Sequence, residues 1–285
     1  MLIRTSTNYM IAALRETTPH SDYMNYALKQ DTRPPIDSQA MPESPLYHRR
    51  CGYLSIPKTV APSSNMFELL DETRKITDAF VARSSPLGCK KLWTPTLTVG
   101  GLNAFDNISG LVMNVFAFPT AEELTFRTTS DRYTYEAIRL SSRIYGHALS
   151  SHIPLSEAAV QLSAAMPALH GPLGSTTPSR RTDARAIHVD IKDALVRTEL
   201  AGCWGHMAGV LFWVTLVAGA SANPQSAGLE RGGGGRGETN GEEEARMWLA
   251  AVAVRCSIVL SFEFGGAMLE TLKTMVAIQE TLAAR

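Results

Sequence analysis

The sequence has no cluster of cysteines. Among its 285 residues only four are cysteine, and they stand far apart: Cys51, Cys89, Cys203 and Cys256. No two of them have the short spacing that zinc ligands show, so we expect no zinc site. Cys203 and Cys256 fall within apolar segments. We interpret the four as reduced, mostly buried thiols of an intracellular protein.

The sequence also has no excess of charge. Lys plus Arg and Asp plus Glu both number 27. No overall field therefore draws the chain to nucleic acid or to an anionic membrane. The nearest basic cluster, Arg180–Arg185, contains Asp183 and would make few phosphate contacts. We expect no direct, specific binding of DNA by this chain alone.

Common catalytic motifs are missing as well. There is no G-K-[ST] phosphate loop, no G-x-S-x-G elbow and no H-E-x-x-H pair. Gly232–Gly237 satisfies G-x-G-x-x-G only because it is a glycine run, and no strand pattern precedes it. The histidines are dispersed: His20, His48, His147, His152, His170, His188 and His206. The sequence thus predicts no catalytic, cofactor-binding or metal residues and no cofactor.

The most prominent feature of the sequence is a pair of long apolar stretches near the C-terminus, Gly205–Ala222 and Arg246–Leu282. A helix that is apolar on all sides is buried in a protein core or in lipid. Only Arg255 and Glu263 interrupt the second stretch between Trp248 and Phe264. Each charge needs a partner from another helix or must reach the surface, and placing both in lipid would be expensive. We therefore favour two adjacent helices in one core over a membrane hairpin, and expect no membrane partner.

The remaining helices are predicted from one-sided apolar spacing and from proline or capping signals. In Asp131–Ser151, for example, Glu136, Arg139 and Arg143 fall on the polar arc. The predicted helices are Asn65–Arg83, Asn103–Phe118, Ala121–Arg127, Asp131–Ser151, a short one from Ser156 to about Pro167, and Ile187–Leu200.

The predicted fold is all-α, an irregular multi-helix bundle with a buried apolar helix pair near the C-terminus. Residues 1–64 carry many prolines and form a partly irregular N-terminal segment. Residues 65–285 form one helical domain. A flexible, disordered loop at 223–245 interrupts it, because that stretch is rich in glycine and charge.

Several segments, in order, resemble the fungal-specific transcription factor domain. They are SPLYHRRCGYLS (44–55), FELLDETRKITDAFV (67–81), YEAIRLSSRIYGHALSSHIP (135–154), GVLFWVTLVAGASA (209–222) and RMWLAAVAVRCSIVLSFEFGGAMLETLKTMVAIQ (246–279). This domain is the all-helical regulatory region that follows a binuclear zinc cluster in fungal regulators. The resemblance lies in helical patterns and covers most of Ser44–Gln279.

The resemblance implies a nuclear role in transcription regulation, with the cytoplasm as the alternative location. It also implies protein partners, with a homodimer or heterodimer and a small-molecule effector as open alternatives. The family reads DNA through a cluster of six cysteines, which this chain does not contain. We therefore expect a non-enzymatic regulatory domain without its own DNA-binding module. The alternatives are an enzyme or small-molecule-binding protein with a dispersed site, and a membrane-associated hairpin protein.

Overall fold

The computed structural model describes residues 2–15, 43–47, 53, 63–84, 108–165, 186–201, 203–223 and 240–284. Within these ranges the protein is all-α, as the sequence predicts, and Ser44 and Tyr47 form one isolated bridge that closes a turn. The helices are α1 (Leu2–Arg15), α3 (Ser64–Ser84), α4 (Ile108–Ala117), α5 (Thr129–Ser151), α6 (Leu155–Ala165), α7 (Ile187–Val196), the short 3-10 helix η2 (Gly205–Met207), α8 (Ala208–Ser221) and α9 (Asn240–Ala283).

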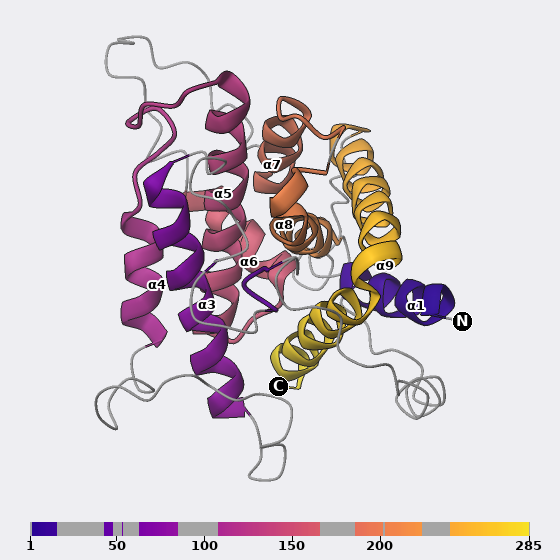
Figure 1. Ribbon diagram of the computed structural model, residues 1–285. Coiled ribbons are helices and arrows are strands. Elements are labelled where there is room, and N and C mark those ends of the chain that lie inside the picture. The colour runs from indigo at the N-terminus through magenta and orange to yellow at the C-terminus, as the bar shows by residue number, and fades with distance from the viewer. Residues whose placement is uncertain are drawn as a thin grey trace.

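Helix α5 is central and packs against α3, α4, α6, α7 and α8 (Figure 1). The hydroxyl of Thr128 accepts the backbone N–H of Asp131 at its start, and His152 adopts a left-handed conformation at its end. Side chains of α4 and α3 lie beside Gly146, where a Cβ would make ordinary contact with Val112 at 3.4 Å and Ile76 at 3.5 Å. The α3–α4 pair can therefore lie directly on α5.

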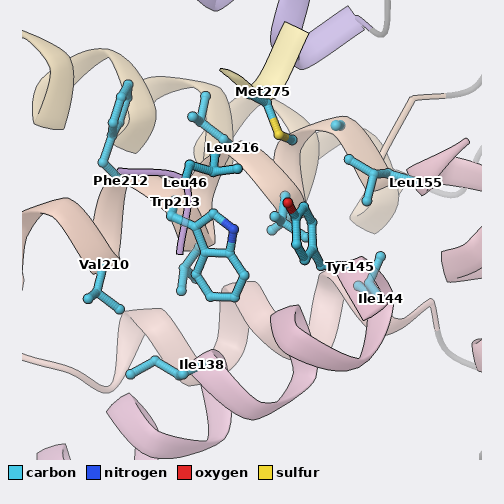
Figure 2. Packing of buried hydrophobic residues seen from close by; sticks show 14 of the residues in the cluster. Leu46, Ile138, Ile144, Tyr145, Leu155, Val210, Phe212, Trp213, Leu216 and Met275 are labelled. Carbon is cyan, nitrogen blue, oxygen red and sulfur yellow. The ribbon is translucent and has the colours of Figure 1, made fainter. Parts of the chain in front are cut away.

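Helix α8 lies within the core, and every one of its residues is buried. Figure 2 shows Trp213 from α8 beside Tyr145 from α5, with Leu216 and Met275 nearby. The two rings meet edge to face, with centroids 5.8 Å apart and an interplanar angle of 84°. The hydroxyls of Tyr145 and Thr77 are hydrogen-bonded at 3.0 Å, so the buried tyrosine also has a polar partner.

Helix α9 packs against α8, but the prediction that its apolar first half is buried on all sides is wrong. Met247, Val254, Ile258 and Val259 are 60%, 39%, 49% and 45% exposed. One face of this half packs on the bundle, through residues such as Leu249, Cys256 and Leu260. The helix bends at Phe264 (φ −132°, ψ 37°), directly before Gly265-Gly266, where the missing side chains weaken helical preference.

Helix α1 packs against α9, close to its bend in Figure 1, and also touches α8. Gln279 Nε2 donates to the Ala13 carbonyl at 2.7 Å, and Asn223 Nδ2 donates to the Arg15 carbonyl at 2.6 Å. Tyr9, Ala13 and Leu46 belong to the same buried cluster as the later helices. The described parts of segment 1–64 thus complete the core of the helical domain.

Two predicted elements need correction. Residues 121–124 form turns and a bend instead of the predicted helix Ala121–Arg127. Glu123 accepts the Thr120 N–H as the capping signal predicts, but the Ala121 N–H donates to Glu136, which holds the segment against α5. The predicted loop at 223–245 is too long, since α9 already begins at Asn240. Glu242 and Glu243 favour a helix N-terminus, and Glu244 pairs with Lys192 on α7 at 2.6 Å. The rest of that loop, residues 224–239, lies outside the described residues.

Candidate functional site

A group of interacting polar side chains lies on α5, in Tyr135, Glu136, Arg139 and Arg143, which we call the α5 network. The sequence places Glu136, Arg139 and Arg143 on the polar arc of this helix, where exposure is expected. Instead Arg139 is fully buried and Glu136 is 22% exposed. The α4–α5 connection lies over this part of the helix, as its hydrogen bonds to Tyr135 and Glu136 show.

Arg139 and Glu136 form a two-pronged ion pair one helical turn apart. Arg139 Nε donates to Glu136 Oε2 at 2.9 Å, and Arg139 Nη2 donates to Glu136 Oε1 at 2.5 Å. Such a bidentate arrangement is the strongest form of this pairing. It neutralises a guanidinium that has no contact with water.

The same network fixes the backbone of the α4–α5 connection. Glu136 Oε2 accepts the Ala121 N–H at 3.3 Å, and the Tyr135 hydroxyl donates to the Pro119 carbonyl at 2.9 Å. Arg143 Nη2 donates to the Phe116 carbonyl at 2.9 Å. Three side chains of α5 thus satisfy backbone groups at the end of α4 and in the turn that follows.

Burial and mutual charge shift the pKa values of the network. Burial alone would raise the pKa of Glu136, but the hydrogen bonds and charge of Arg139 lower it below the usual 4.5. Burial and the neighbouring charge of Arg139 lower the pKa of Arg143 to about 10. Burial raises the pKa of Tyr135 to about 12, so its phenol stays neutral and is a poor base. The network therefore acts as a structural connector between α4 and α5.

The Glu136 shift predicts an acid-dependent loss of stability. A carboxyl group with a lowered folded-state pKa stabilises the fold above its unfolded pKa, and that contribution disappears as the pH falls through the folded pKa. The urea midpoint should therefore decline from about pH 4.5 downwards. The Glu136→Gln variant should be less stable at neutral pH and should lose less on acidification. An identical acid dependence in both proteins would contradict this assignment.

Three of the described histidines, His147, His152 and His188, take part in packing or local contacts, and His206 is exposed. His147 Nε2 lies 2.8 Å from Gln161 Oε1, which links α5 to α6. His188 is buried, and its burial lowers its pKa. No group of three His, Cys, Asp or Glu side chains in the described ranges could hold a metal ion. The expected absence of a metal site stays a prediction, because Cys51, Cys89, His20, His48 and His170 lie outside those ranges.

Arg255, one of the two charges in the second apolar stretch, reaches the surface, and its partner lies in a connection and not on another helix. Its side chain is exposed, and Nη2 donates to the Ala201 carbonyl, in the α7–α8 connection, at 2.9 Å. The Glu263 side chain lies outside the described residues. Arg255 therefore joins α9 to a neighbouring turn and needs no catalytic explanation.

The exposed apolar face of α9 is the second candidate site. It consists of Met247, Ala251, Val254, Ile258 and Val259, which we call the α9 stripe. The spacing of four, three and four residues from Met247 to Ile258 places these side chains on one face. Glu244 and Arg255 lie on one side of the face that runs from Met247 to Ile258, and both are exposed. A contiguous apolar surface of this kind is typical of a contact site.

The sequence does not distinguish the α9 stripe, because its residues are as apolar as those on the buried face of the same helix. Within α9, only the positions of charged residues indicate which face is exposed, since Glu244 and Arg255 fall on the stripe side of the helix. No described helix is both long enough and apolar enough to cross a bilayer.

Comparisons with known proteins identify no relative of this chain. No family model matches the chain, and no curated protein or solved structure matches it either.

Proposed function

We propose that this chain is a non-enzymatic, regulatory helical domain of the transcription-regulator type that acts through protein contacts. The segment resemblance supports the transcription-linked role and the nuclear location. The α9 stripe is the observation that carries the contact function. Its large apolar side chains are 39–60% exposed although the neighbouring α8 is fully buried.

The partner that best fits the stripe is a second copy of the same chain. A two-fold symmetric contact needs a surface that is complementary to itself. Glu244 and Arg255 lie on the same edge of the stripe, about 16 Å apart along the helix. In an antiparallel pair of α9 helices, Glu244 of each copy can therefore lie opposite Arg255 of the other.

The same alignment also pairs side chains of matching size. When residues 244 and 255 are opposite one another, so are residues 241 and 258. A Cβ at Gly241 would have no atom within 4 Å, so the space beside it is open. The 49% exposed side chain of Ile258 can enter that space in the partner copy. Charge and shape thus select one antiparallel register.

The oligomeric state of the purified chain tests this proposal. We expect a dimer for the wild-type protein by light scattering after gel filtration. Ile258→Glu should weaken the dimer at least about tenfold, because a carboxylate at an apolar contact costs more than 1.4 kcal/mol. Its helical circular dichroism should be unchanged, since the residue is exposed.

Two controls make the test specific. Val160→Glu changes a 52% exposed valine on α6, away from the stripe, and should leave the dimer intact. Glu244→Arg and Arg255→Glu should each weaken association, and the double exchange should restore part of it. Because these changes also remove the contacts of Glu244 with Lys192 and of Arg255 with Ala201, each variant is compared at equal helical circular dichroism. A wild-type chain that stays monomeric at high micromolar concentration would overturn the proposed partner.

A further inference from the structure

The two halves of α9, on either side of the bend at Phe264 (Figure 1), bury very different side chains. The first half, residues 240–261, buries only two large apolar side chains, Leu249 and Leu260. Burial of apolar surface supplies most of the free energy that holds a helix in place, so the first half is held much more weakly than the second. The second half buries seven large apolar side chains: Met268, Leu269, Leu272, Met275, Val276, Ile278 and Leu282.

The first half, which we call the α9 arm, also carries most of its large apolar side chains on its outer face. Met247, Val254 and Ile258 are exposed, whereas Ala245 and Ala253 face the core. A helix with a fixed position normally shows the reverse, because a large apolar side chain gains more from burial than alanine does. The side chains of the arm therefore give little preference to the position that it occupies.

The bend that joins the two halves is lightly packed. Ser261 and Phe264 are only partly buried, and Gly266 is exposed. A Cβ at Gly265 or Gly266 would meet no atom within 4 Å, and neither glycine has a positive φ. Packing and backbone conformation thus do not require these two glycines, although glycine destabilises a helix relative to alanine. What they do provide is a point where the helix bends easily.

Polar contacts show the same difference between the halves. The arm is attached by Glu244, which is 67% exposed and lies 2.6 Å from Lys192, and by exposed Arg255, which donates to the α7–α8 connection at 2.9 Å. Exposed ion pairs contribute little to stability. In the second half, by contrast, the buried Gln279 donates to a carbonyl of α1 at 2.7 Å. The second half is therefore fixed to the bundle, and the arm is not.

We propose that the α9 arm is a conformational switch that opens as one unit about the bend at Phe264. In the closed state the arm lies against α7 and the α7–α8 connection. In the open state it swings away as an intact helix, while the second half stays in place. The movement grows with distance from the bend. Leu260, about 6 Å along the helix from Phe264, stays close to the core, whereas Glu243, about 30 Å away, moves furthest.

The alkylation rate of Cys256 measures this opening. Cys256 lies on the buried face of the arm and is 1% exposed, so it reacts only when the arm opens or the whole chain unfolds. Val276→Cys places a second thiol at a 2% exposed position in the second half, where it reports global unfolding alone. Tryptic peptides 256–273 and 274–285 separate the two thiols for mass spectrometry. We expect Cys256 to react at least about 100-fold faster.

Two alanine exchanges locate the pivot. Gly265→Ala combined with Gly266→Ala should slow the alkylation of Cys256 about tenfold, because alanine favours a continuous helix across the bend. Gly241→Ala is the matched control, since a Cβ there also meets no atom within 4 Å but lies far from the bend. It should leave the rate unchanged.

All of these measurements use the Ile258→Glu background, so their outcome does not depend on whether the wild-type chain forms the proposed dimer. Equal alkylation rates for Cys256 and the thiol introduced by Val276→Cys would overturn the proposal, because the arm would then open only with the whole chain. Equal slowing by Gly241→Ala and by the exchange of both bend glycines would overturn it too, because the opening would not pivot at the bend.

Discussion

Leu260→Asp is expected to prevent the chain from folding. Leu260 is 2% exposed and lies on the face of α9 that packs into the core. The substitution removes a buried isobutyl group and introduces a carboxylate with no charged partner. The combined cost is about 5 kcal/mol or more, comparable with the whole stability of many domains.

Circular dichroism and the yield of soluble protein measure this effect. Ala277→Asp is the matched control, because Ala277 is exposed on the same helix and the change introduces the same charge. The control should fold with nearly wild-type stability. If Leu260→Asp folded as well as Ala277→Asp, the assignment of the buried face of α9 would be wrong.

Glu136→Ala should cost about 3–5 kcal/mol of unfolding free energy, because it leaves the fully buried guanidinium of Arg139 without its counter-ion. The change also removes the acceptor for the Ala121 N–H. The α4–α5 connection should therefore loosen. Urea unfolding at neutral pH measures the loss, and hydrogen exchange at residues 118–124 locates it.

Two further variants distinguish a buried pair from an ordinary surface charge. Glu122 pairs with Arg132 at 3.3 Å but is 82% exposed, so Glu122→Ala should cost less than about 1 kcal/mol. The double variant Glu136→Leu with Arg139→Met should regain part of the stability, because it removes both charges. A single Glu136→Ala change that costs no more than Glu122→Ala would contradict the proposed role of the α5 network.

Local sequence patterns predicted the well-marked helices closely. The apolar spacing of Asn65–Arg83 and Asp131–Ser151 matches α3 and α5 to within two residues at each end. These helices have one apolar face and clear end signals, so neighbouring residues suffice to define them. The all-α class follows from the same local information.

Features that depend on tertiary contacts could not be predicted in the same way. The sequence pattern places Arg139 on a polar arc, because a charged residue is normally exposed. In the structure the α4–α5 connection, more than ten residues away in the sequence, covers it. The exposure of the α9 stripe could not be predicted either, because the exposed and buried faces of this helix carry similar apolar residues. Which face meets solvent depends on where α8 lies, and no local pattern encodes that position.

The contact between α1 and the second half of α9 has a consequence for the order of folding during synthesis. Ala13 accepts a hydrogen bond from Gln279, 266 residues later in the sequence. A ribosome that adds 5–20 residues per second needs on the order of ten seconds to a minute to make that partner. Throughout this time the apolar face of α1, with Tyr9, Met10 and Ala13, has no α9 to cover it. The nascent chain is therefore expected to expose a chaperone-binding helix until α9 has been synthesised.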